Sequence, residues 1–154
     1  MTILSPSFAA AEVELIYRSQ VDVADRPIIN TSADAFKVLL NAWDKNKIEF
    51  VEQFSILLLN DANHCLGYSC IHTGGISKCP VDFRIAFATA LKANATSIII
   101  AHNHPSGEVI PSASDLYVTQ TFVDVGDIMT IPVKDHLIIT PAKFYSLADQ
   151  GVLR

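Results

Sequence analysis

The stretch that decides the fold runs from Thr96 to Asp115 and reads TSIIIAHNHPSGEVIPSASD. Its first part, Thr96 to Ala101, is a short β-branched run bounded by polar residues, which predicts a strand buried on both faces. Side chains alternate between the two faces of a strand, so His102 and His104 point the same way if the strand continues. We therefore expect two imidazoles to converge at the end of this strand.

A helix is predicted to follow the loop after the two histidines. Ser112 opens it, and it runs to about Val125, ahead of Gly126. One face of this helix carries residues at i, i+3, i+7 and i+10, namely Asp115, Val118, Phe122 and Val125. This spacing places the Asp115 carboxylate on the apolar, inward side, where a buried carboxylate needs a partner.

Two histidine nitrogens and one aspartate oxygen form a three-ligand set for zinc, with the fourth tetrahedral position left for water. Such an open position is typical of a catalytic site, whereas a structural zinc site is usually closed by four ligands, often Cys. Two structural alternatives stand beside this interpretation. Ser112 and Asp115 also have the spacing of a capping box at a helix start. His102 and His104 are equally compatible with a strand-end pair bonded to the backbone.

The segment HNHPSGEVIPSASD, from His102 to Asp115, resembles the JAMM motif of the JAB/MPN metalloprotease superfamily. It is most similar to the RadC branch, whose members read HNHPSG followed by a P-S-x-x-D turn. The likeness covers about residues 50–153. The resemblance implies an α/β (α+β) fold with a JAB/MPN-type mixed β-sheet flanked by helices.

The resemblance also implies roles for five residues. His102, His104 and Asp115 match the zinc ligands of JAB/MPN enzymes. Ser112 matches the serine that helps to hold the oxyanion, and Glu52 matches the upstream glutamate that acts as general base on a zinc-activated water. The implied reaction is hydrolysis of an amide or isopeptide bond in a peptide or protein substrate. From the residues alone, a solvated Glu52 ahead of an apolar run is the alternative.

Four residues near these motifs are not included among the predicted ligands. His136 is either a support that orients a site residue by hydrogen bonding or a strand-start histidine satisfied by its own neighbours. The three cysteines have spacings that match no usual zinc pattern and suit free thiols in a reducing compartment: Cys65, Cys70 and Cys79.

Length and composition fit one compact domain. The chain has 154 residues, of which 50% are hydrophobic and 18% are charged. We interpret residues 1–154 as a single domain, with residues 1–48 as an N-terminal extension and residues 49–154 as the core that holds the site. No apolar stretch is long enough to cross a membrane, and the N-terminus lacks the positive region of a signal peptide. These features predict a cytoplasmic protein with no membrane partner.

Charge bears on the choice of partner. The net charge is −5 and no Lys/Arg cluster is visible, so strong autonomous binding to nucleic acid is not expected. Many RadC-like proteins carry a helix-hairpin-helix module with glycine in its turns. Here no glycine precedes Gly67, so that module is expected to be absent.

The complete residue set favours a zinc peptidase or isopeptidase over a non-catalytic metal-stabilised binding module and over a DNA repair or recombination factor.

The remaining elements follow from periodicity and turn signals. The helix that begins at Pro80 is predicted to bury a face at i, i+4 and i+8, namely Phe83, Phe87 and Leu91. Residues after Asp127 are expected to return as one or two strands. The other expected elements are a strand over Val13–Val21, a helix capped by Ser32 that runs through Trp43, strands over Gln53–Asn60 and Cys65–His72 joined by a turn over residues 61–64, the end of the Pro80 helix at Ala93, and a helical end over Lys143–Gln150.

Overall fold

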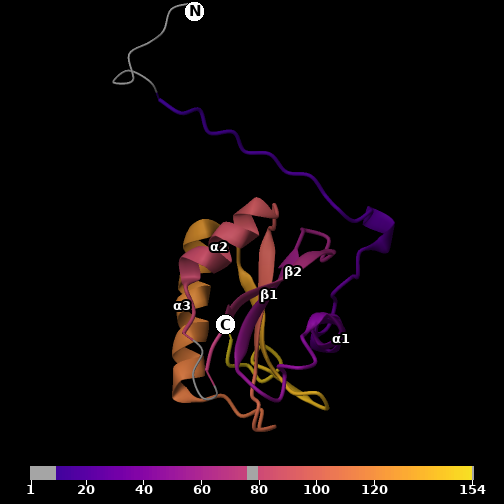
Figure 1. The fold of residues 1–154 in the computed structure, drawn as a ribbon, viewed down its shortest axis with the longest axis vertical. Helices are drawn as coiled ribbons and strands as arrows, with labels where there is room; N and C mark the ends of the chain where they lie inside the picture. The colour runs from indigo at the N-terminus through magenta and orange to yellow at the C-terminus, as the bar shows by residue number, and fades with distance from the viewer. Residues whose placement is uncertain (1–9, 76–79, 154) are drawn as a thin grey trace, which may run out of the picture.

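A five-stranded mixed sheet forms the centre of the molecule (Figure 1). The computed structural model describes residues 10–75 and 80–153. The strand order is β2-β1-β3-β4-β5; β3 and β4 are parallel, and the other neighbours are antiparallel. The strands are β1 Gln53–Leu59, β2 Cys65–Thr73, β3 Ser97–Asn103, β4 Val133–Ile139 and β5 Phe144–Ser146. The predicted α/β class with a mixed sheet flanked by helices is confirmed.

Helices cover both faces of the sheet. Figure 1 shows α2 (Phe83–Lys92) and α3 (Ala113–Met129) on one side and α1 (Ser32–Ala42) on the other. Along β3, Ile98 and Ile100 pack with the α2 and α3 side, whereas Ile99 and Ala101 pack with the α1 side. The β-branched run is therefore buried on both faces, as predicted.

The parallel pairing of β3 with β4 fixes where the site lies. Parallel neighbours need a crossover connection, and α3 provides it. The chain leaves β3 at Asn103 and enters α3 at Ala113, so the end of the strand and the start of the helix lie at the same edge of the sheet. In α/β sheets, ligand sites form outside the carboxyl ends of strands.

Two helix boundaries differ from the sequence predictions. The N-cap of α1 is Thr31 and not Ser32, because the Thr31 hydroxyl accepts the backbone N–H of Asp34. α2 begins at Phe83 and not at Pro80, because the Asp82 carboxylate accepts the backbone N–H of Arg84 and caps the helix. The predicted inward face of α2 is also partly wrong, since Leu91 is 52% exposed. The buried residues of α2 are Ala86, Phe87 and Ala90.

Two predicted elements are absent from the described residues. Residues 13–21 form no strand there, and Val13 is 92% exposed. Apolar alternation alone does not form a strand, because the backbone needs a partner ladder. Lys143–Gln150 is not helical either: residues 144–146 form β5, and a turn follows. The Ser146 hydroxyl and the Ala148 N–H bond the Asp135 carboxylate, which fastens this segment to β4.

Gly126 lies inside α3 and does not end it, contrary to the prediction. A Cβ at this position would lie 2.6 Å from the carbonyl oxygen of Ile131, so the glycine permits a close approach of two backbone segments. The helix continues to Met129 and ends at Thr130, which has a left-handed φ of 57°. α3 has 17 residues, and no helix in the described part of the chain is long and apolar enough to cross a membrane.

Candidate metal centre

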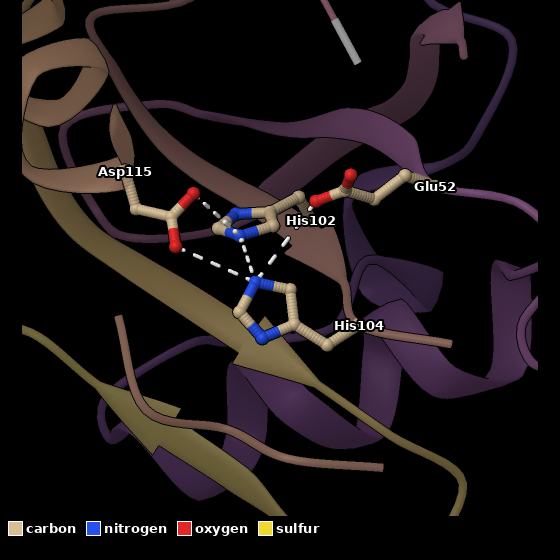
Figure 2. A group of neighbouring side chains, drawn as sticks. All are labelled: Glu52, His102, His104 and Asp115. Carbon is tan, nitrogen blue, oxygen red and sulfur yellow. Dashed lines mark hydrogen bonds and ion pairs between the residues drawn. The ribbon is translucent and has the colours of Figure 1, made fainter. Parts of the chain in front are cut away.

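Four side chains meet at the carboxyl end of β3 (Figure 2). His102 lies near the end of this strand, His104 directly follows its last residue, and Asp115 comes from the first turn of α3. Glu52 directly precedes β1, the antiparallel neighbour of β3. One ligand atom from each of the four lies within 4.8 Å of the others. The structure thus brings together the three predicted ligands and the predicted general base.

The two imidazoles face each other through their Nε2 atoms. These nitrogens are 2.9 Å apart, and the Asp115 carboxylate spans both, with Oδ1 3.2 Å from His102 Nε2 and Oδ2 3.4 Å from His104 Nε2. Glu52 Oε1 lies 3.9 Å from His104 Nε2 (Figure 2). Two nitrogens with two carboxylates around them form a donor set suited to a divalent cation.

The backbone fixes the orientation of His104. Its Nδ1 lies 2.8 Å from the carbonyl oxygen of Glu108. A carbonyl only accepts, so Nδ1 carries the hydrogen, and the neutral ring presents the lone pair of Nε2 to the cluster. His104 is therefore in the tautomer that a metal ligand requires.

The charges in the cluster influence one another. Burial alone raises the pKa of Asp115, but the imidazoles of His102 and His104, which donate to its carboxylate when they are protonated, and the Ser112 N–H hold that pKa well below its ordinary value. Protonated His104 can donate to Asp115, and this raises the pKa of His104 against the opposing effect of burial. Asp115 is therefore an anion at neutral pH, as a metal ligand must be.

Ser112 is the N-cap of α3. Its Oγ accepts the backbone N–H of Asp115 at 3.1 Å, and Asp115 Oδ2 accepts the Ser112 N–H at 2.7 Å. The capping box proposed as an alternative is therefore present, and it coexists with the side-chain cluster. Because the cap uses a lone pair of the hydroxyl, the O–H hydrogen of Ser112 remains available to donate to another group.

Asn103, which the sequence analysis missed, holds the segment that carries Glu52. Its amide nitrogen donates to the carbonyl oxygens of Ile48 at 2.7 Å and Val51 at 2.9 Å, and its Oδ1 accepts the Gln53 N–H at 2.7 Å. The Glu52 side chain is only 15% exposed, which contradicts the solvated alternative. The sequence did carry a signal for this residue, because side chains alternate between the two faces of a strand. Asn103 lies between the two histidines and therefore points to the opposite face.

The cluster lies at the wall of a cavity of about 520 Å³. Glu52, His102 and Asp115 border it together with Ser112. The other described lining residues are mainly apolar: Phe54, Pro80, Val81, Ser114, Val118 and His136. The site therefore has a polar corner for chemistry and an apolar wall for a ligand.

His136 bonds to a site residue, as one of its two interpretations predicted. Its Nε2 lies 2.8 Å from His102 Nδ1, and burial lowers its pKa well below the ordinary value. Cys65 and Cys70 are free thiols, and Cys79 lies outside the described residues. Within residues 10–75 and 80–153, the cluster of Figure 2 is the one group of three or more His, Cys, Asp or Glu side chains placed to hold a metal.

Comparison with known proteins gives one family match. The model of the RadC-like JAB domain matches residues 29–152. A UPF0758 protein of Flavobacterium johnsoniae is 35% identical over 144 residues, covering 94% of this chain and 61% of that protein. A UPF0758 protein of Desulfitobacterium hafniense is 36% identical over 144 residues, with 93% and 62% covered. The UPF0758 protein YkfG of Escherichia coli K12 is 40% identical over 102 residues, with 66% and 65% covered.

The chain thus spans 61% and 62% of the first two relatives, and the names of all three describe no activity.

Proposed function

The chain belongs to the RadC-like JAB domain family, and we propose that it is a zinc-dependent hydrolase that cleaves an amide or isopeptide bond in a peptide or protein. One observation carries this proposal. Two imidazoles, an ionised aspartate and a glutamate converge within 4.8 Å at the wall of a cavity. A net charge of −5 supports a peptide or protein substrate over a nucleic acid.

His102, His104 and Asp115 are the residues that would hold the metal. Two imidazole nitrogens and one carboxylate oxygen match the ligand types of catalytic zinc sites. The close approach of the two Nε2 atoms, at 2.9 Å, supports this assignment because two lone pairs at that distance repel each other unless a proton or cation lies between them. A bound zinc ion supplies Lewis-acid polarisation of a carbonyl and lowers the pKa of water from about 16 to about 7.

Glu52 is the proposed proton carrier. Its carboxylate accepts a proton from the attacking water as the new C–O bond forms, and then delivers that proton to the leaving nitrogen as the C–N bond breaks. Asn103 keeps this carboxylate in place through its three bonds to the neighbouring backbone.

Ser112 is the proposed oxyanion donor. The carbonyl oxygen becomes negative in the tetrahedral transition state, and the Ser112 O–H is free to donate to it. Loss of one such donor in other hydrolases costs about 2.7 to 4 kcal/mol of transition-state stabilisation.

Metal content and cleavage test the proposal together. We expect about one zinc per chain by elemental analysis of protein purified without chelator, and loss of that zinc in His104→Ala and Asp115→Ala. A panel of peptides and ubiquitin-like conjugates is then screened with the wild type and with Glu52→Gln. The expected result for Glu52→Gln is full zinc content without cleavage.

Two outcomes contradict the proposal. A folded wild type that neither contains zinc nor takes it up excludes the metal centre. Full zinc content with no cleavage of any panel member points to a metal-stabilised binding module.

A further inference from the structure

A fully buried histidine lies on the far side of His102 from the cluster. His136, on β4, is 0% exposed, and its Nε2 lies 2.8 Å from His102 Nδ1. Its other nitrogen, Nδ1, lies 2.6 Å from Thr119 Oγ1 of α3. Both nitrogens of His136 are therefore occupied by neighbours from two different elements.

The directions of these hydrogen bonds follow from one carbonyl group. Thr119 Oγ1 lies 2.7 Å from the backbone oxygen of Asp115, which only accepts, so the single hydroxyl hydrogen of Thr119 is used there. The Thr119 oxygen must therefore accept a hydrogen bond from His136 Nδ1. The hydrogen of His136 is consequently on Nδ1.

A neutral imidazole with its hydrogen on Nδ1 has a lone pair on Nε2. His136 Nε2 must then accept from His102 Nδ1, which places the hydrogen of His102 on Nδ1. The lone pair of His102 is left on Nε2, the atom that faces His104 and Asp115. If the hydrogen bonds ran in the opposite direction, His102 Nε2 would carry a hydrogen and could not bind a metal.

We propose that Thr119 and His136 are positioning residues that set the tautomer of His102 and thereby make it a metal ligand. The chain of hydrogen bonds runs from the Asp115 carbonyl through Thr119 and His136 to His102. The proposal rests on the metal binding proposed above, and it adds two residues that contact neither metal nor substrate.

The two histidines of the motif are thus fixed in different ways. His104 lies next to a loop, and the carbonyl oxygen of Glu108 fixes it directly. His102 is 3% exposed and its Nδ1 faces the side chain of His136. The Asp115 carbonyl oxygen therefore fixes the His102 tautomer indirectly, through Thr119 and His136. Asp115 takes part twice, with its carboxylate in the cluster and with its carbonyl at the start of the chain.

Thr119→Val tests the chain, with Thr119→Ser as the matched control. Valine has nearly the shape of threonine but accepts no hydrogen bond, so it no longer holds the hydrogen of His136 on Nδ1. Serine keeps the hydroxyl. We expect zinc affinity, measured with zinc alone against a competing chelator, to fall about 10- to 100-fold in Thr119→Val and to stay near the wild-type value in Thr119→Ser.

A second readout needs no metal. Nitrogen NMR of the imidazole rings in the metal-free protein reports which nitrogen of His102 carries the hydrogen. The wild type and Thr119→Ser are expected to show it on Nδ1, and Thr119→Val is expected to show a shift of population toward Nε2. Thermal unfolding of the same metal-free samples checks that the variants are folded.

His136 offers an independent pair of variants. His136→Gln retains an acceptor toward His102, and His136→Leu does not. We expect zinc affinity to decrease more in His136→Leu than in His136→Gln.

Unchanged zinc affinity together with an unchanged His102 tautomer in folded Thr119→Val overturns the inference, even if His136→Leu fails to fold. A wild type that binds no zinc overturns the proposed function instead. In that case the NMR measurement still decides whether the hydrogen-bond chain exists.

Discussion

Two helices of this molecule begin with the same local structure. At the start of α1, Thr31 Oγ1 accepts the Asp34 N–H at 3.1 Å and Asp34 Oδ2 accepts the Thr31 N–H at 3.0 Å. At the start of α3, Ser112 and Asp115 form the same reciprocal pair, at 3.1 and 2.7 Å. Both are capping boxes, with an aspartate in the third helical position.

The two aspartates nevertheless have different surroundings. Asp34 Oδ2 bonds the backbone N–H groups of Asn30 and Thr31, and those hydrogen bonds lower its pKa. Asp115 has the same backbone bond and also contacts His102 and His104. The difference teaches that a cap is a local structure, whereas the role of its carboxylate depends on where the fold places the helix start.

The largest expected effect separates these two carboxylates. Asp115→Ala is expected to weaken zinc binding by more than about 100-fold, because loss of an outer hydrogen-bond partner alone costs about 10- to 100-fold. Asp34→Ala loses the equivalent half of a capping box and should bind zinc like the wild type. Competitive zinc titration of both variants measures the difference, and equal losses would show that the helix cap alone accounts for Asp115.

Ser112→Ala and Thr31→Ala compare the two capping hydroxyls. Each variant is expected to lose about 1 kcal/mol of unfolding free energy, because each leaves the backbone N–H of the third helical residue without its acceptor. Only Ser112→Ala should also reduce kcat, by about 100- to 1000-fold, since only this hydroxyl borders the cavity. Denaturant unfolding and cleavage assays measure the two quantities, with Ser112→Thr as the variant that restores both.

Asn103 extends the comparison to the other acid of the site. Asn103→Ala leaves buried backbone groups without partners and is expected to cost about 3 kcal/mol of unfolding free energy. It should also reduce kcat while zinc affinity stays unchanged, because it releases the Glu52 segment and not a ligand.

Asn60→Ala is the control, since Asn60 Oδ1 also accepts two backbone N–H groups, from Ala62 and His64, but far from the cluster in the sheet. If Asn60→Ala reduced kcat as much as Asn103→Ala does, the assigned role of Asn103 in holding the Glu52 segment would be wrong.

The smallest expected effect concerns the far end of α3. Gly126→Ala gains about 1 kcal/mol of helix propensity, but its Cβ would meet the Ile131 carbonyl at 2.6 Å, and overpacking of that kind costs about 1 to 3 kcal/mol. We expect a net loss of about 1 kcal/mol in unfolding free energy and no change in zinc affinity. An increase in melting temperature would show that the backbone relaxes without cost.

Local patterns in the sequence predicted much of the fold. The β-branched run predicted β3, and the turn between two apolar runs predicted the β1-β2 hairpin, since both patterns depend on neighbours in the chain. The strand predicted over Val13–Val21 was wrong because the pattern does not show whether a partner strand exists. The helical end predicted over Lys143–Gln150 was wrong because the Asp135 carboxylate, distant in sequence, holds that segment in β5 and a turn.

The sequence by itself determined the residue types of the candidate site and the shared direction of His102 and His104, because the period of a strand is a local property. It also determined the capping box at Ser112 and the grouping of Asp115 with the two histidines. The tertiary structure decided how they come into contact, because the parallel crossover carries the start of α3, and not the capping box of α1, to the end of β3. It also placed Glu52, Asn103, Thr119 and His136 around the cluster, because their contacts join segments that are far apart in the chain.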